Sequence, residues 1–338
     1  MWTEERLDAL MCEPSEALTA DIKKIDGDIL ILGAGGKMGP TLCCLAKNAC
    51  KKAGIDKRII AVSRFTDEFA VKLLSAGGVE VIPCDLMKPN ALDALPDVKN
   101  IIYMAGRKFG TDGQEHLTWA MNAWLPSLVA ERYKNSNIVV FSSGNVYPFV
   151  PISSGGCAET AKTAPVGEYA MSCLARERVF EYAAHTYGTK IFTYRLNYAI
   201  DFRYGVLHDI ARNIIDGNEV SVSTPVFNCI WHGDANAIAI RGLLHCESPA
   251  NIVNVTGPET VSVRHIAQTL GELLGKQPKF SGTEQSDALI SCADKCIELF
   301  GYPTVGISEM LKMQAEWIQS GGRSLGKPTH FEERKGSF

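Results

Sequence analysis

The chain has 338 residues, of which 46% are hydrophobic and 21% charged, and its formal net charge is −4. This composition is typical of a soluble globular protein and gives no reason to expect nucleic acid or a membrane as a partner. No apolar run is long enough to cross a membrane, and the first residues lack the pattern of a signal peptide. The eleven cysteines show no CxxC pair and no metal-ligand spacing, so we expect reduced, mostly buried thiols, no metal site and a cytoplasmic protein.

Residues 1–26 precede the first strand and read as two short amphipathic helices split at Pro14. An unbroken apolar run at 29–32 then predicts a strand buried on both faces of a parallel sheet. Strands and helices alternate after it, which predicts an α/β, doubly wound Rossmann domain over residues 27–196. The other strands are expected at 58–63, 79–83, 100–104, 137–142 and 190–196, and the helices at 37–53, 66–76, 90–95, 114–134 and 167–187.

The alternation loosens at about residue 197. Residues 197–338 predict a smaller, mixed α/β substrate lobe that covers the cofactor cleft and partly returns to the main sheet. We expect a helix within 201–217, short strands at 219–223 and 251–255, helices near 262–274 and 306–319, and an extended arm from residue 320.

Glycines follow the first strand at three-residue spacing, as Gly33, Gly36 and Gly39. This pattern is typical of a dinucleotide site. The first glycine permits a tight turn, the second lets the backbone approach a pyrophosphate, and the third lets helix and strand pack closely. The helix that follows presents free N–H groups to the phosphates. Ligands of such sheets bind at the carboxyl ends of the strands, so the residues after each strand are the candidate site residues.

Six segments resemble motifs of the extended short-chain dehydrogenase/reductase family, also called NAD-dependent epimerases/dehydratases, over roughly residues 27–300. They are GAGGKMG (33–39), CDL (84–86), YMAG (103–106), FSSGNVYP (141–148), YAMSC (169–173) and NVTGPETVSVR (254–264). The resemblance implies that Tyr169 exchanges a proton with the substrate and that Ser143 holds the substrate oxygen. The residues expected to bind the cofactor are Gly33, Gly36, Lys37, Met38, Gly39, Ser63, Arg64, Asp85, Leu86, Met104, Ala105, Gly106, Tyr169 and Asn197. Those expected to bind substrate are Ser143, Asn145, Arg107, Lys108 and Tyr198.

The chain departs from the family pattern at Cys173, where the family's YxxxK motif has its lysine. A free tyrosine has a pKa near 10, and a nearby cation is what makes the phenolate accessible at neutral pH. Three hypotheses follow. Another cation substitutes, either Arg176 on the same helical stripe or Arg107 or Lys108 at a neighbouring strand end; or Tyr169 acts only as an acid or hydrogen-bond donor; or the protein binds cofactor without turnover. We expect the Cys173 thiol to be buried and inert.

Arg64 follows the second strand where an acidic residue would indicate NAD, which favours NADP over NAD. Two arginines that bind a sugar-nucleotide diphosphate in the family are missing, one of them replaced by Phe227, and the dehydratase Asp-Glu pair is replaced by Gly144-Asn145. These departures disfavour a UDP-sugar epimerase and a 4,6-dehydratase.

The leading hypothesis is an NAD(P)-dependent oxidoreductase or epimerase acting on a small sugar-derived substrate, such as a sugar acid. The alternative is a catalytically silent NAD(P)-binding protein that senses redox state or supports a partner. The resemblance also implies a homodimer through the helices at 114–134 and 167–187. The apolar residues of these segments, Trp119, Trp124, Leu125 and Leu128, fit such a contact and also fit ordinary core packing.

Overall fold

The strand β1 (Ile29–Leu32) lies inside a seven-stranded parallel sheet. A computed structural model of the chain describes residues 2–110, 112–327 and 329–336. In the sheet, β1 pairs with β2 (Ile59–Ser63) and β4 (Asn100–Tyr103), and the full order is β12-β7-β5-β4-β1-β2-β3. The remaining strands are β3 (Glu80–Pro83), β5 (Asn137–Ser143), β7 (Lys190–Leu196) and β12 (Asn251–Val255). The prediction of a doubly wound parallel sheet is confirmed.

The order of the strands reverses beside β1. From β1 the chain proceeds outward to β2 and β3, and it then returns to the other side of β1 to form β4 and β5. The loops that follow β1 and β4 therefore leave the sheet toward opposite faces, and a crevice opens between them at the carboxyl ends of the strands. This crevice is the place where the fold positions a ligand.

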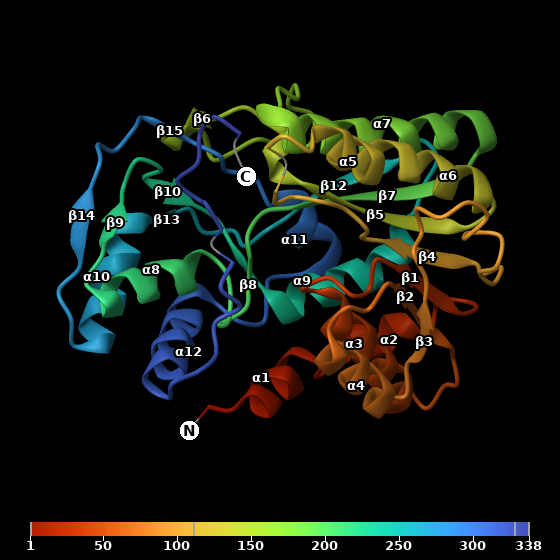
Figure 1. Cartoon of the computed structure of the whole chain (residues 1–338), viewed down its shortest axis with the longest axis horizontal. Helices are drawn as coiled ribbons and strands as arrows, with labels where there is room; N and C mark the ends of the chain where they lie inside the picture. Colours follow the sequence, from red (N-terminus) through yellow and green to blue (C-terminus); the bar gives the residue numbers. More distant parts are fainter. Residues whose placement is uncertain (1, 111, 328, 337–338) are drawn as a thin grey trace.

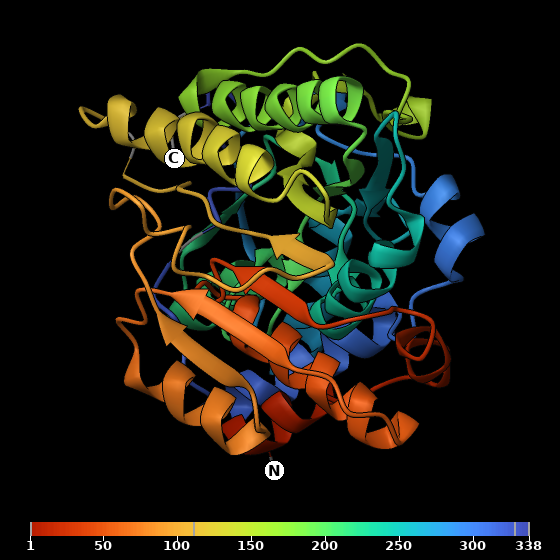
Figure 2. The same cartoon turned by 90° about the vertical axis from the view of Figure 1, so that its right-hand side faces the viewer.

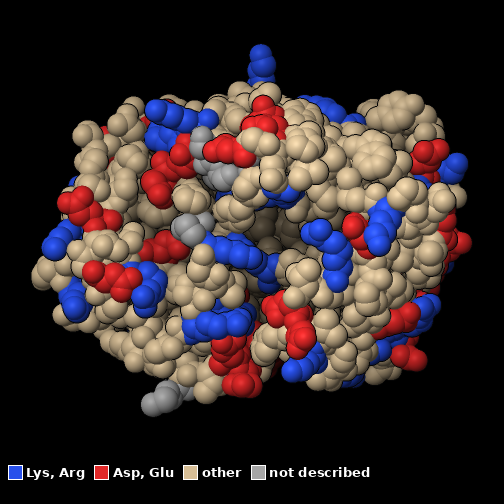
Figure 3. All heavy atoms as spheres, viewed as in Figure 1, with Lys and Arg blue, Asp and Glu red and all other residues tan. Residues whose placement is uncertain are grey.

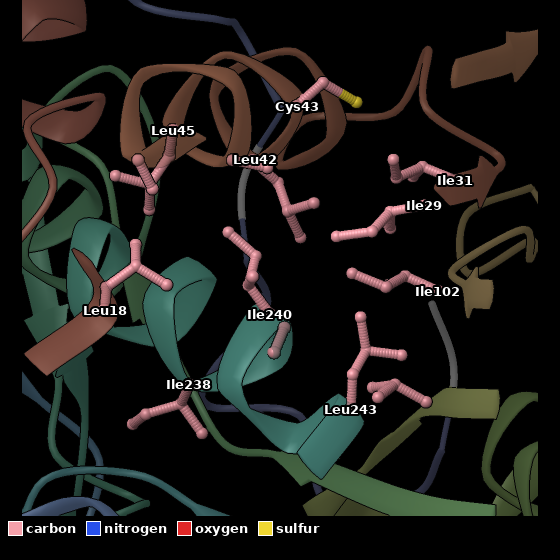
Figure 4. Packing of buried hydrophobic residues seen from close by; sticks show 14 of the residues in the cluster. Leu18, Ile29, Ile31, Leu42, Cys43, Leu45, Ile102, Ile238, Ile240 and Leu243 are labelled. Carbon is pink, nitrogen blue, oxygen red and sulfur yellow. The ribbon is translucent and has the colours of Figure 1, made fainter. Parts of the chain in front are cut away.

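Helices cover both faces of the sheet (Figures 1 and 2). One face carries α2 (Glu16–Ile22), α3 (Gly39–Ala53), α4 (Glu68–Gly77) and α9 (His232–Arg241). Their apolar side chains meet those of β1 and β4 in a continuous core, where Leu42, Ile31 and Ile240 lie close together (Figure 4). The other face carries α5 (Glu115–Trp119), a π-helical turn η1 (Ala120–Trp124), α6 (Leu125–Arg132) and α7 (Gly167–Tyr187).

Two predicted helices differ from the structure. The segment 90–95 forms turns instead of a helix. Asn90 adopts a left-handed conformation with φ of 59°, and the segment between Pro89 and Pro96 is too short to propagate a helix. The predicted helix 114–134 exists, but the π-helical turn interrupts it, and the buried Asn122 lies in this turn. Such π-turns change the direction of side chains within a helix.

A second lobe follows β7 and has its own apolar core. Its main helices are α8 (Val206–Asp216), α10 (Val263–Leu274) and α12 (Ile307–Gln319), and α11 (Asp294–Phe300) packs instead against β12. The short strands outside the main sheet are β6 (Val150–Pro151), which comes before β7, and β8 (Ala199–Ile200), β9 (Glu219–Ser221), β10 (Val226–Phe227), β11 (Ile230–Trp231), β13 (Val261–Ser262), β14 (Lys279–Ser281) and β15 (Asp287–Ala288). The 3₁₀ turns η2 (Gly144–Val146) and η3 (Ile152–Ser154) also come before β7, and η4 (Gly242–His245) follows it. No described helix has both the length and the apolar character that crossing a bilayer requires.

The two N-terminal helices belong to different cores. α1 (Glu4–Met11) buries Leu7 and Met11 in the core of the second lobe. Its Asp8 forms an ion pair with Arg203, with 2.9 Å between Asp8 Oδ1 and Arg203 Nη1. α2 buries Leu18 among the residues beside the main sheet (Figure 4). The N-terminal segment thereby connects the two lobes on the outside of the molecule.

Candidate functional site

A cavity of about 360 Å³ opens at the carboxyl ends of the central strands, between the main sheet and the second lobe. Figure 3 shows a hollow near the middle of one face of the molecule, with Lys and Arg side chains around its rim. The predicted residues that line the cavity are Gly36, Lys37, Met38, Met104, Gly106, Arg107, Lys108, Ser143, Asn145, Tyr169, Arg176, Asn197 and Tyr198. These side chains come from five separate segments that the crevice brings together.

The glycine loop after β1 fits a dinucleotide. Gly33 has φ of 93°, and a Cβ there would lie 2.5 Å from the Ala105 nitrogen, so only glycine fits between the two strand ends. A Cβ on Gly39 would lie 2.2 Å from the Ala34 carbonyl oxygen, which keeps α3 tight against the loop. Gly36, by contrast, faces open space with its nearest neighbour 3.5 Å away. Gly33 and Gly39 thus shape the loop from behind, whereas Gly36 leaves room for a phosphate to approach the backbone.

The four residues predicted on the adenine side lie outside the cavity. The Ser63 hydroxyl, at the end of β2, is 2.6 Å from the position of a Cβ on Gly35 and so borders the glycine loop. Arg64 is exposed after it. Asp85 accepts a hydrogen bond from the Met87 amide at 3.1 Å, and Leu86 is buried under the sheet edge. Ser63 is therefore close to the loop and Arg64 is exposed next to it, whereas Asp85 and Leu86 stabilise the neighbouring turn.

The Ser143 and Tyr169 hydroxyls come together at the floor of the cavity. Ser143 is the last residue of β5, and Tyr169 lies in the first turn of α7. Burial and the adjacent Cys173 thiol raise the pKa of the Tyr169 phenol, whereas the charge of Arg176 and a hydrogen bond with Ser143 lower it. Ser143 also donates to the Asn145 side-chain oxygen at 3.1 Å, which orients the serine hydroxyl.

Cys173 lies one helical turn after Tyr169 and does not line the cavity. It is buried against Val146 and Tyr147, and burial raises the pKa of its thiol. The structure thus agrees with a thiol that stays protonated behind the phenol. The uncharged Cys173 thiol cannot supply the positive charge that a lysine would place beside Tyr169.

Arg176 is a cation on the same stripe of α7 as Tyr169 and Cys173. Its guanidinium donates to the Phe141 carbonyl oxygen and to the Asn122 side-chain oxygen, each at 2.7 Å. The side chain is only 5% exposed, and its Nε has no hydrogen-bond partner among the described residues. Arg176 lines the cavity and lowers the pKa of both Tyr169 and Cys173. A buried guanidinium with a free donor beside a phenol is a ready source of positive potential.

A buried ion pair supports this floor from behind. Glu177 on α7 accepts hydrogen bonds from Arg195 Nε at 2.9 Å and Arg195 Nη2 at 2.6 Å. It also accepts one from Ser142, the residue before Ser143. Arg195 donates further to the Tyr147 hydroxyl, which itself donates to Asn254. The network connects α7, β5, β7 and β12, so it holds the strand end that carries Ser143.

The residues after β4 include a lysine next to Tyr169. The Lys108 ammonium lies 5.7 Å from the centre of the Tyr169 ring, and burial lowers its pKa to about 8. Arg107 turns away from the phenol and donates to the Gly110 carbonyl and to Gln114. Among the predicted substitutes for the missing lysine, the structure therefore brings Arg176 and Lys108 near Tyr169, whereas the Arg107 guanidinium is used in its own loop.

Asn197 and Tyr198 follow β7 and form the wall toward the second lobe. Asn197 packs against Gly144 and donates to the Asn228 side-chain oxygen at 2.8 Å. Tyr198 has φ of 44°, which turns the chain sharply at the boundary between the lobes. Behind it, the ring of Phe227 packs edge-on at 6.1 Å, fully buried in the second core.

Several lining residues were not predicted from the sequence. They are Phe109, Phe141, Ser142, Leu196, Ala199, Asp201, Tyr204, Gly205, Leu325 and Thr329, and His232 lines the cavity as well. Phe141 and Leu196 lie within two residues of the predicted Ser143 and Asn197, so their place near strand ends gave a weak indication from the sequence. His232 is fully buried within 3.0 Å of the Thr41 hydroxyl, and burial lowers its pKa to about 4, so it is neutral. Leu325 and Thr329 come from the C-terminal arm and had no signal at all.

Comparison with known proteins agrees with this fold. Residues 29–226 match the model of the NAD dependent epimerase/dehydratase family. No curated protein sequence matches the chain. The UDP-glucuronic acid 4-epimerase from Bacillus cereus in complex with UDP-glucuronic acid and NAD has a similar structure, with a TM-score of 0.70 at 18% identity over 87% of this chain and 99% of that one.

Two further solved structures are similar over 87% of this chain. The UDP-Glc/GlcNAc 4-epimerase from Campylobacter jejuni has a TM-score of 0.70 at 19% identity over 99% of its own chain. The dTDP-glucose 4,6-dehydratase from Streptomyces venezuelae, with NAD and TYD bound, has a TM-score of 0.71 at 17% identity over 97% of its chain. At such identities the likeness shows the fold, while the family match spans more than half of the sequence. The chain is therefore an enzyme that belongs to the NAD-dependent epimerase/dehydratase family.

Proposed function

We propose that this protein is an NAD(P)-dependent oxidoreductase or epimerase of a small, sugar-derived substrate, with Tyr169 and Ser143 at its reacting centre. The observation that carries the proposal is the meeting of these two hydroxyls in the cavity beside the glycine loop. The backbone of Gly36, Lys37 and Met38 would hold the dinucleotide phosphates, and Met104, Gly106 and Asn197 would border the rest of it. When bound, the dinucleotide supplies the hydride chemistry.

Tyr169 is assigned as the proton-transfer group and Ser143 as the hydrogen-bond donor to the substrate oxygen. General acid or base catalysis by a positioned side chain contributes about 10²–10⁴-fold. Ser143 is held by Asn145 and by the strand end that the Glu177–Arg195 pair supports. The Ser143 oxygen is thereby held in place before the substrate arrives, and its hydrogen, which Asn145 accepts in the structure, would turn to the substrate oxygen.

Arg176 is assigned as a positioning residue that provides the positive potential missing at Cys173. Its charge opposes the burial that raises the pKa of Tyr169. Because the guanidinium is fixed by the Phe141 carbonyl and by Asn122, it holds this position without the flexibility of a lysine. This assignment supports an active enzyme over the alternative of a protein that only binds cofactor.

A small substrate is supported by the wall toward the second lobe. Phe227 stands where the family resemblance expects a pyrophosphate-binding arginine, and it is buried behind Tyr198. A buried aromatic ring offers no charge to a diphosphate.

Arg64 supports NADP as the preferred cofactor. It is exposed beside the glycine loop, on the side where Ser63 borders Gly35. A guanidinium there can pair with a 2′-phosphate. If NADP is preferred, Arg64→Ala weakens NADP binding in titration calorimetry and leaves NAD binding unchanged; equal affinities in both proteins would favour NAD.

We also propose a homodimer through α5, α6 and α7. Trp124 and Tyr182 are 52% and 62% exposed on these helices, and Trp119 is 36% exposed. Leu125 is fully buried in the protomer's own core, which is the core-packing alternative left open by the sequence. Light scattering of the purified protein should give twice the chain mass, and a monomer mass would contradict the proposal.

The decisive experiment compares Tyr169→Phe with Tyr182→Phe, an exposed tyrosine on the same helix. A panel of sugars and sugar acids is first tested by nicotinamide absorbance at catalytic enzyme concentration. On the substrate found, Tyr169→Phe should lower kcat by about 10²–10⁴-fold, with unchanged dinucleotide affinity, and Tyr182→Phe should change neither. Full turnover in Tyr169→Phe would overturn the assignment. Dinucleotide binding without turnover on any member of the panel would favour the silent alternative.

A further inference from the structure

The C-terminal arm, which follows α12 from residue 320, is fixed across the second lobe. The Leu325 amide donates to the Arg203 carbonyl oxygen at 2.9 Å. The Thr329 amide and hydroxyl both donate to the Asp209 carboxylate, at 2.7 and 2.5 Å. In Figure 1 the arm runs from α12 across the middle of the molecule toward the start of α7. The arm is therefore bound to the lobe by its backbone as well as by side chains.

The arm reaches α7, the helix that carries Tyr169. Phe331 is buried in the core of the second lobe. A Cβ on Gly336 would lie 2.4 Å from the Val166 carbonyl oxygen, and one on Gly167 would lie 2.3 Å from the Gly336 oxygen. Because neither glycine leaves room for a side chain, the end of the arm is packed closely against the start of α7.

The arm lies between two cavities, since neighbouring residues in it face different ones. Leu325 and Thr329 line the cavity that also contains Tyr169 and Ser143. A second cavity of about 480 Å³ lies on the side of α8 and β9, and its arm residues are Ser324, Gly326, Lys327 and His330. No described residue lines both cavities. The arm thus separates two spaces that would otherwise adjoin.

Leu325 forms a fixed part of the wall of the first cavity. Its amide hydrogen bond places it beside the loop 201–205, three residues of which line the same cavity. Arg203, to which it is bound, is itself buried in ion pairs with Asp201 and Asp8, each at 2.9 Å. The apolar Leu325 side chain offers no hydrogen bond, so its contribution to the cavity is shape.

The second cavity does not suit the diphosphate of a nucleotide sugar. Its charged lining consists of three carboxylates and two cations, namely Asp209, Glu219, Glu332, Arg212 and Lys327. Arg212 already pairs with Asp216 at 3.1 Å. This lining has no excess of positive charge, and carboxylates repel phosphate groups. A nucleotide that extended past the arm into this space would therefore meet no complementary charge.

We propose that the C-terminal arm confines the substrate to the cavity beside Tyr169, with Leu325 as the residue that limits its size. The substrate class is then a free sugar or sugar acid that carries no nucleotide. This inference rests on the proposed function, since it specifies the substrate of the same cavity and assigns its selection to a segment outside the main sheet.

The test uses the full-length protein saturated with dinucleotide and two pairs of probes, D-glucuronate with UDP-D-glucuronate and D-galactose with UDP-D-galactose. Titration calorimetry should show that at least one free sugar binds, and that its UDP derivative binds at least about tenfold more weakly. Leu325→Phe and Leu325→Trp add volume to the cavity wall and should weaken the free sugar by about threefold and about tenfold.

The matched control is Lys327→Trp, which places the same bulky ring on the arm but in the lining of the second cavity. It should leave the affinity for the free sugar unchanged. The dinucleotide affinity of each variant is measured alongside and shows whether that variant is folded. If Leu325→Trp is not folded, the smaller Leu325→Phe carries the test.

Four results would overturn the proposal. They are no binding of any free sugar, equal or tighter binding of a UDP derivative, an unchanged affinity in the folded Leu325 variants, and the same loss in Lys327→Trp. An equal loss of dinucleotide affinity in the Leu325 variants would also overturn it, because Leu325 would then border the dinucleotide. Failure of the wild-type protein to bind any dinucleotide would instead overturn the proposed function.

Discussion

Two groups of buried or half-buried charges lie on either side of the cavity floor, and they are built in opposite ways. Behind the floor, the unlike charges of Glu177 and Arg195 are matched, with further hydrogen bonds from Ser142 and Tyr147. In front of it, the like charges of a lysine cluster, Lys37 and Lys108, lie 4.8 and 5.4 Å from the centre of the Phe109 ring. Matched charges hold a structure in place, whereas gathered like charges attract an anion.

The largest expected effect comes from breaking the matched pair. Glu177→Leu leaves Arg195 buried without its counter-ion, and we expect a loss of about 3–5 kcal/mol in the free energy of unfolding. Denaturant unfolding measures this loss. The double variant Glu177→Leu with Arg195→Met removes both charges and should recover most of it; no recovery would mean that the hydrogen bonds around the pair matter more than its charges.

Arg176 lies between the two regions and should affect the rate more than the stability. Arg176→Met removes the charge that lowers the pKa of Tyr169. We expect the pH at which the base form acts to move up by about one unit, with about a tenfold lower kcat at pH 7. The pH profile of kcat measures this, and Arg176→Lys should restore part of the rate. A lower kcat with an unshifted profile would indicate a purely structural role.

The lysine cluster makes anion affinity depend on pH. Lys37 and Lys108 have pKa values lowered to about 7 and about 8. An anion binds their protonated forms, so its affinity should be highest below pH 7 and fall as pH rises through 7 to 8. Calorimetry with D-glucuronate between pH 6 and 9 should show about a tenfold loss. Constant affinity would indicate that neither lysine meets the anion.

The smallest expected effect is a difference in how the two regions respond to salt. Surface-accessible charges are screened at moderate ionic strength, whereas buried pairs are screened much less. Raising NaCl from about 0.05 to 0.5 M should weaken D-glucuronate binding about two- to threefold. The stability difference between the wild-type protein and Glu177→Leu should stay unchanged, and an equal response of both would contradict the comparison.

Much of the main sheet could be predicted because its signals are local. The apolar run of β1 and the glycines after it lie within a dozen residues, and the strand ends follow from the same alternation. The prediction of a helix at 90–95 was wrong because Asn90 adopts a left-handed conformation. The prolines at 89 and 96 are only weak local signs of such a turn. The Tyr169–Ser143 pair depended on a family resemblance, since the two residues lie on different elements.

The sequence by itself determined the parallel sheet and the glycine loop, because each depends on residues close together in the chain. Only the tertiary structure decided which cation lies beside Tyr169, since Arg176, Arg107 and Lys108 were equal candidates until packing aimed Arg107 into its own loop. It also decided that the C-terminal arm forms a wall of the cavity. Contacts between segments hundreds of residues apart follow from the packing of whole elements, which no local pattern encodes.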